Sequence, residues 1–250
     1  MAEKDKKVVA FERSDEEKAA AAALIRAETE WQLAKVREAN SIASMKELQL
    51  ESTEAEALRI REAEAIRRAN DEYNFIYRFY GAVTISTVDQ AIQTLTAWHR
   101  LNEGVDLEII FNSPGGSVID GFELFDFIVD LRANGHQVTT GCTGMAASMA
   151  GILVQAGDIR WMSRESWYMI HRAAFGAVGK TFEVEDTVEW IKRIEARIQD
   201  IFVARSKLTK REITKKWDRK DWWISSDEAL AKGLVDEVRS SGLVPVSTDG

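Results

Sequence analysis

The N-terminal part of the chain places apolar residues at helical spacings without a sustained heptad register. From about Ser14 to Glu72 there is no proline or glycine, and alanine, glutamate, arginine, lysine and leucine predominate, which predicts helix. Ser14 followed by Glu17 fits a capping box. We therefore predict a helical extension over residues 1–72. It is either a loose coiled coil or interaction helix, or a single solvated helix.

Beyond Tyr73 the pattern changes to short β-favouring runs that alternate with amphipathic helical ones. Repeated strand and helix units of this kind predict an α/β domain, which we assign to residues 73–240, with a flexible tail at 241–250. The expected strands are 75–80, 83–85, 107–111, 137–143, 159–162 and 166–170, and the expected helices are 88–101, one from Val118 that stops near Gly135, 150–155 and 183–204.

Composition limits the class of protein. The 250 residues, 45% hydrophobic and 30% charged, suffice for one core and an appendage. A net charge of −8 argues against nucleic-acid or anionic-membrane binding. The single cysteine, Cys142, excludes an internal disulfide and fits a small core residue in a reducing compartment. Without a long apolar run or signal-peptide pattern, we expect a cytoplasmic protein, and no residue cluster suggests a metal or organic cofactor.

A candidate nucleophile stands in the run from Gly144 to Ala150, where Ser148 lies among small residues after a β-favouring stretch. A serine hydroxyl needs a base within hydrogen-bond reach, and the chain has three histidines. His99 and His136 read as surface residues. His171 ends an apolar strand, where catalytic side chains commonly emerge, so it is the candidate base.

Four motifs together resemble the proteolytic subunit of the Clp protease over about residues 75–239. The resemblance implies a spiral of ββα units, shared with crotonases, and a catalytic triad of Ser148 as nucleophile, His171 as base and Asp221 as the group that orients the base. The motifs are Asn112-Ser113-Pro114-Gly115-Gly116, then Gly144-Met145-Ala146-Ala147-Ser148-Met149-Ala150, then Met169-Ile170-His171, and then Lys220-Asp221-Trp222-Trp223-Ile224-Ser225-Ser226-Asp227-Glu228-Ala229-Leu230 followed by Gly233-Leu234-Val235-Asp236.

The oxyanion of a peptide-cleaving serine requires two backbone donors. The first expected donor is the N–H of Met149, immediately after the nucleophile. The resemblance implies that the second is Gly116, and two residues without Cβ let this loop approach a substrate closely.

The helix at 183–204 carries an apolar stripe that needs a partner. The resemblance implies that this helix is a protruding handle, which interdigitates between two stacked rings of seven subunits and closes a chamber for unfolded polypeptides. Packing of the stripe on the domain's own sheet is the alternative. We expect Trp217, Trp222 and Trp223, beside Asp221, to be wall or core residues.

The chain departs from the Clp pattern at three places. Lys220 stands where an arginine usually pairs across the ring interface, and Arg172 and Ala173 stand where a proline often follows the histidine. The long helix before Tyr73 replaces the short axial loops that touch an ATP-driven unfoldase. The sequence therefore leaves open whether the chain depends on an ATP-driven unfoldase.

Several functions follow from these patterns. The first is an oligomeric serine endopeptidase that cleaves unfolded polypeptides, and a variant of it is a bacteriophage head-maturation protease with a helical scaffold or propeptide. A second class is a crotonase-like enzyme that acts on an acyl-CoA, but in such an enzyme the presence of all three triad residues would be coincidental. A non-catalytic scaffolding subunit would have no need of all three.

Overall fold

The computed structural model describes residues 14–239. Contacts divide the chain into two compact units, with the boundary between Arg67 and Arg68, and each is described by itself. The predicted tail at 241–250 lies outside the described residues.

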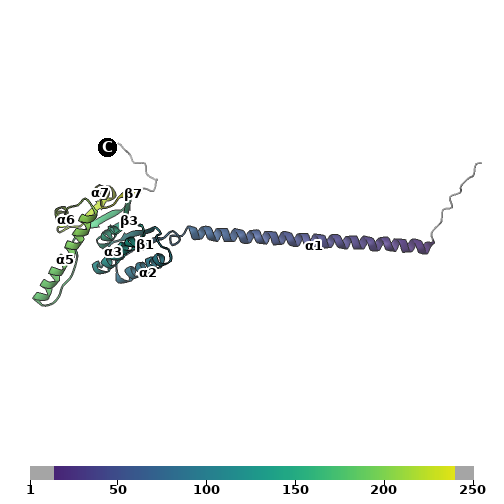
Figure 1. The fold of residues 1–250 in the computed structure, drawn as a ribbon, viewed down its shortest axis with the longest axis horizontal. Helices are drawn as coiled ribbons and strands as arrows, with labels where there is room; N and C mark the ends of the chain where they lie inside the picture. Colours follow the sequence, from purple (N-terminus) through teal and green to yellow (C-terminus); the bar gives the residue numbers. More distant parts are fainter. Residues whose placement is uncertain (1–13, 240–250) are drawn as a thin grey trace, which may run out of the picture. The chain divides into compact units, whose positions relative to one another are not determined.

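The described part of the N-terminal unit is one continuous helix, α1 (Asp15–Arg68), which has 54 residues and ends one residue beyond the unit boundary; it is drawn in purple to blue in Figure 1. The predicted capping box is confirmed, because the Ser14 N–H donates to Glu17 Oε2 at 2.9 Å and the Glu17 N–H donates to Ser14 Oγ at 3.3 Å. No residue of α1 is buried, and its apolar side chains point to all sides. A coiled coil is a property of an assembly and stays a prediction. Within residues 14–239, no helix combines the length and apolar character needed to cross a bilayer.

The second unit is built on a sheet of seven strands, in which the central strand β3 pairs with β2, β4 and β5. The order β1-β2-β3-β4-β7 is parallel throughout, while β5 runs parallel to the last part of β3 and β6 runs antiparallel to β5. The predicted α/β fold is confirmed. The strands are β1 (Ile76–Tyr80), β2 (Leu107–Ser113), β3 (Val138–Ala147), β4 (Ile159–Ser163), β5 (Trp167–Ile170), β6 (Trp222–Ser225) and β7 (Glu237–Arg239).

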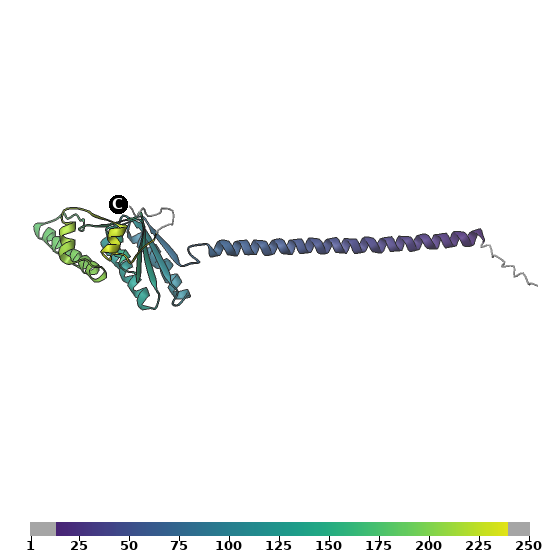
Figure 2. The same ribbon diagram turned by 90° about the horizontal axis from the view of Figure 1, so that it is seen from above.

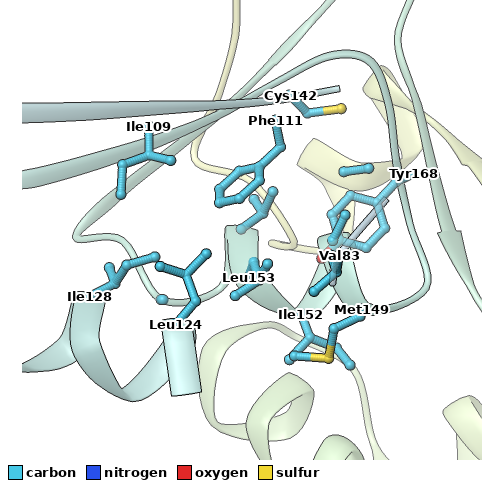
Figure 3. Close-up of a cluster of buried hydrophobic side chains, with 14 of the residues drawn as sticks. Val83, Ile109, Phe111, Leu124, Ile128, Cys142, Met149, Ile152, Leu153 and Tyr168 are labelled. Carbon is cyan, nitrogen blue, oxygen red and sulfur yellow. The ribbon is translucent and has the colours of Figure 1, made fainter. Parts of the chain in front are cut away.

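Alternating residues of the sheet face the helices and form the core. In β2, Ile109 and Phe111 are buried against Leu124 and Ile128 of α3 and Leu153 of α4 (Figure 3). Each such side chain contributes about 1.5–3 kcal/mol by its removal from water. The helices of this unit are α2 (Ile85–Leu101), α3 (Val118–Ala133), α4 (Met149–Val154), α5 (Thr181–Arg205), α6 (Lys210–Trp217) and α7 (Ser226–Ala231).

The strand predicted at 83–85 is wrong. Thr84 is the N-cap of α2, since its hydroxyl accepts from the Thr87 N–H at 3.3 Å and the Thr87 hydroxyl accepts from the Thr84 N–H at 3.0 Å. Only Val83 keeps a strand-like contact, an isolated parallel bridge to Gly116. A reciprocal cap satisfies two amide donors that a short edge strand would leave open.

The surface position predicted for His136 is also wrong. His136 is 3% exposed, and its ring lies between His99, with 2.8 Å between ring nitrogens, and the Val105 carbonyl oxygen at 2.9 Å. Both of its nitrogens are used in hydrogen bonds, which is how a buried imidazole avoids an unsatisfied polar group.

The two halves of α5 have different surroundings. From Ile191 onwards the apolar residues Ile191, Ile194 and Phe202 are buried in this unit, as the alternative of packing on the domain itself requires. In the first half Phe182 and Trp190 are about half exposed, and this end of the green helix projects from the body of the unit (Figures 1 and 2). The prediction that this helix is a protruding handle therefore concerns only its first half, and there it remains a prediction.

The tryptophans near Asp221 have two kinds of environment. Trp217 and Trp222 are buried, as expected of core residues, whereas Trp223 on the outer strand β6 is 45% exposed.

Candidate active site

Ser148, His171 and Asp221 lie at adjoining ends of three paired strands. Ser148 directly follows β3, His171 directly follows β5, and Asp221 directly precedes β6. Because β5 and β6 are antiparallel with Ile170 opposite Trp222, the next positions along the two strands are His171 and Asp221. Strand register alone therefore brings the imidazole and the carboxylate face to face.

The pairing of β3 with β5 places the serine. Ala147 is opposite Met169, and the Ser148 N–H donates to the Met169 carbonyl at 2.9 Å. Ser148 then turns the chain sharply from strand into α4, with φ 55° and ψ −125°. A residue with a side chain seldom adopts this conformation, which costs on the order of 1–3 kcal/mol and is concentrated at functional sites.

The three side chains form a connected chain of contacts. Ser148 Oγ lies 2.7 Å from His171 Nε2, and Asp221 Oδ1 lies 3.4 Å from His171 Nδ1. When the serine hydroxyl donates to Nε2, the ring proton sits on Nδ1 and faces the carboxylate. The His171 and Asp221 side chains are 27% and 54% exposed, so the imidazole is reachable from solvent and Asp221 lies at the surface of this chain.

The loop after β2 packs directly on the serine. A Cβ added to Gly115 would lie 2.6 Å from the Ser148 Cβ and 2.9 Å from the Met149 nitrogen. With φ +88° as well, the position is restricted to glycine by both contact and conformation.

Gly116 is held by its bridge to Val83. The Val83 N–H donates to the Gly115 carbonyl, and the Ser117 N–H donates to the Val83 carbonyl, both at 2.8 Å. In a parallel bridge of this kind the N–H of the middle residue, Gly116, points away from Val83. The N–H of Met149 is the first of α4 and has no partner within the helix turn.

A mainly apolar pocket opens beside Ser148 and His171. Its lining comes from α4, from the end of β5 and from the buried part of α5. An apolar side chain next to the scissile bond would fit this lining. The other lining residues are Val118, Met149, Ile152, Ile170, Ala173, Ile198 and Phe202.

The sequence did not indicate that α5 contributes to this pocket. The helical spacing of Ile198 and Phe202 indicates only that they belong to a stripe that needs a partner. One signal was available, because Glu195 interrupts that stripe and a carboxylate on a buried face requires a cation. The cation is Arg172, immediately after His171.

Cys142 has the environment of a core residue. Its side chain is fully buried, and burial raises the pKa of the thiol to about 12 although a hydrogen bond with Ser166 opposes the shift. The thiol is therefore protonated at neutral pH and is a poor nucleophile.

Comparison with known proteins identifies the family. A sequence model described as "Clp protease" matches residues 63–242. The chain belongs to the Clp protease family. The matched segment contains all three residues of the Ser148, His171 and Asp221 cluster as well as the Gly115 loop, whereas most of α1 lies outside it.

Named members of the Clp protease family match the central part of the chain. The "ATP-dependent Clp protease proteolytic subunit" of Porphyromonas gingivalis is 36% identical over 137 residues, which are 54% of this chain and 60% of the relative. A protein of the same name from Bacteroides fragilis is 35% identical over 140 residues, 55% of this chain and 66% of the relative. The chain thus matches less than two thirds of the length of these relatives.

Proposed function

We propose that the chain is a serine endopeptidase that hydrolyses peptide bonds through Ser148, His171 and Asp221. The observation that carries the proposal is the 2.7 Å contact between Ser148 Oγ and His171 Nε2, at a serine with a positive φ. Family membership supports the same reaction. The 3.4 Å separation of Asp221 from the ring is compatible with this role, because catalytic contacts are often long before substrate binds.

In the first half of the reaction Ser148 Oγ bonds to the carbonyl carbon of the substrate and its proton passes to His171 Nε2. Asp221 stabilises the imidazolium that forms and keeps the ring in the useful tautomer. When the C–N bond breaks, His171 returns the proton to the leaving amine, and the acyl group stays on Ser148 as an ester.

In the second half water attacks the ester, His171 takes the proton of that water, and Ser148 leaves with it as the hydroxyl. In both halves the carbonyl oxygen carries negative charge. The N–H groups of Met149 and Gly116 stabilise this charge, and a single such donor typically contributes about 10²–10³-fold to the rate. The outward direction of the Gly116 N–H and the close packing of Gly115 on Ser148 support this assignment.

The substrates we propose are unfolded polypeptides with an apolar side chain at the pocket, whose lining is largely aliphatic and aromatic. We further propose an oligomer of two stacked rings. Its support is the first half of α5, where Phe182 and Trp190 are exposed on a projecting helix. A projecting helix that exposes apolar side chains offers a surface on which another subunit could pack.

The test is intact-mass analysis after treatment with a fluorophosphonate, which reacts with activated serines. We expect one adduct on the wild type and none on Ser148→Ala. Ser86→Ala, at an exposed serine of α2, is the control and should react like the wild type. Peptide cleavage by Ser148→Ala should fall by about 10⁴-fold or more. An equal adduct on Ser148→Ala would refute the assignment.

A second candidate, favoured by α1, is a role in assembly. A helix of 54 residues without a buried side chain offers surface for a scaffold, as in a head-maturation protease or a non-catalytic subunit. Absence of any adduct on the wild type would favour the non-catalytic subunit over both kinds of peptidase. The same chain, mixed with a folded protein substrate with and without an ATP-driven unfoldase, would show whether it uses the kind of partner implied by the relatives' name.

A further inference from the structure

An ion pair ties the residue after His171 to α5. Arg172 Nε donates to Glu195 Oε1 at 3.0 Å and Arg172 Nη2 donates to Glu195 Oε2 at 2.8 Å, a two-pronged arrangement that fixes both position and angle. Hydrogen bonding to Glu195, its charge and the more distant charge of Asp218 raise the pKa of Arg172. The guanidinium is therefore charged throughout the range in which proteins fold.

Glu195 is unusual for its place on the helix. It is 8% exposed, and Ile191, Ile194 and Ile198 around it on α5 are buried apolar residues. A carboxylate in such a setting destabilises the fold unless a cation compensates it, and Arg172 supplies the cation with half of its own side chain in water.

The two partners stand next to residues that line the pocket beside Ser148, in two different segments of the chain. Arg172 stands between His171 and Ala173, which both line the pocket and lie in a segment outside the helices and strands. Glu195 stands three residues before Ile198 and seven before Phe202, on the same face of α5, and these two also line the pocket.

We propose that the Arg172–Glu195 ion pair is a positioning device that holds the His171 segment against α5, and so fixes both the imidazole relative to Ser148 and the width of the pocket. This inference rests on the proposed peptidase function of the site. Neither partner touches the reacting atoms. The pair acts by preventing the irregular segment after β5 from moving away from α5, and displacements of about 1 Å at such a site cost up to about 10²-fold in rate.

The experiment compares Arg172→Gln, Glu195→Gln and the reversed pair Arg172→Glu with Glu195→Arg in the full chain. We measure the rate of fluorophosphonate labelling and the thermal midpoint of each. Both single variants should label about tenfold or more slowly at temperatures where they are folded, and the reversed pair should recover most of the rate. Glu189→Gln is the matched control, because it breaks the exposed Glu189–Lys192 pair on the same helix.

A purely electrostatic influence on the imidazole would act in opposite directions in the two single variants, since one removes a positive and the other a negative charge. Loss of the Arg172–Glu195 ion pair as a positioning contact, in contrast, slows labelling in both single variants. Unchanged labelling rates in the single variants, a change in thermal midpoint alone, or no recovery in the reversed pair would each overturn the proposal.

A second readout separates this inference from the peptidase assignment. The chain has three histidines, so the ring signal of His171 can be followed by NMR in histidine-labelled protein and assigned by its loss in His171→Gln. We expect the signal to move in both single variants, to return in the reversed pair and to be unaffected in Glu189→Gln. If the His171 signal shifts in the single variants but the wild type does not react with the fluorophosphonate, the peptidase assignment is refuted and the positioning role of the Arg172–Glu195 pair is retained. If the His171 signal does not shift in the single variants, the positioning role of the Arg172–Glu195 pair is refuted, even if the wild type reacts with the fluorophosphonate.

Discussion

At the scale of single residues, Gly115 provides a sharp test of the site. Gly115→Ala should reduce the rate of fluorophosphonate labelling at least about tenfold, because its Cβ would lie 2.6 Å from the Ser148 Cβ and displace the serine. Gly81→Ala is the control, since Gly81 has a similar φ of +93° but open space around its Cβ position. Both variants should lose about 1 kcal/mol of stability from the backbone, whereas only the first should lose reactivity. Equal labelling of both would mean that the loop adapts.

The residues of the site differ in how far the sequence could predict them. Ser148 and His171 stand at the ends of recognisable strands, and the structure brings them together with Asp221. The burial of His136 could not be predicted, because its partners His99 and Val105 are brought to it by the packing of other elements. Tertiary contacts of this kind leave no local pattern.

At the scale of elements, β7 has only three residues, and an ion pair between Asp236, directly before β7, and the buried guanidinium of Arg160 in β4 helps to attach it. Arg160 Nη2 lies 2.6 Å from Asp236 Oδ1, and the Arg160 N–H donates to Asp236 Oδ2 at 2.9 Å. Burial acts to raise the pKa of Asp236, yet hydrogen bonds from Arg160 and its charge prevail and hold that pKa below its usual range. The ionised carboxylate thus stabilises the fold.

The pH dependence of this contribution has a definite sign. A carboxyl whose pKa is lowered on folding contributes stability above its unfolded pKa of about 4, and this stability is lost as the pH falls through the lower folded value. Asp236→Asn should therefore reduce the free energy of unfolding at pH 7 by about 1–2 kcal/mol, allowing for the half-exposed carboxylate. Urea titrations at pH 7 and pH 3 should show the difference from the wild type shrinking at pH 3. A difference that persists at pH 3 would show that the ionised carboxylate is not the source.

The accuracy of the predicted elements follows the strength of their local signals. Strands and helices with several apolar positions, such as 107–111 and 183–204, match the observed β2 and α5 closely. The helix α6 was not predicted, because six of its eight residues are polar and its Ile213 and Trp217 give too short a pattern. The extension of β3 to Ala147 was also missed, since it depends on pairing with β5.

At the scale of the whole molecule, the unit boundary at Arg67 and Arg68 predicts that the domain folds without α1. A chain that starts at residue 69 should be soluble and cooperatively folded. A chain that starts at residue 73 should be less stable by about 0.5–1 kcal/mol, because it lacks the Asp71–Arg78 ion pair at the entry to β1. Hydrogen bonding from Arg78 lowers the pKa of Asp71, which agrees with a stabilising contact.

Urea unfolding of the two truncated chains at pH 7, with Arg78→Gln in the longer one as the control, measures this difference. The control should bring the longer chain close to the shorter one. An insoluble chain from residue 69 would show that the helix is required for folding, contrary to the boundary. The sequence indicated a boundary near Tyr73 from the change in pattern alone. It could not indicate that residues 70–74 belong with the sheet, since this depends on contacts such as the Asp71 carboxylate to Arg78 and the Asp71 carbonyl to the Ile76 N–H of β1.

The backbone of Ser148 has a consequence for how this chain can change over generations. Glycine adopts φ 55° and ψ −125° freely, whereas serine is strained there. The turn would therefore be more stable with a glycine at position 148, which has no hydroxyl. Selection for thermal endurance alone would favour losing the hydroxyl. Under the proposed peptidase function, a serine at this turn gives up part of the stability of the fold in return for a reactive hydroxyl.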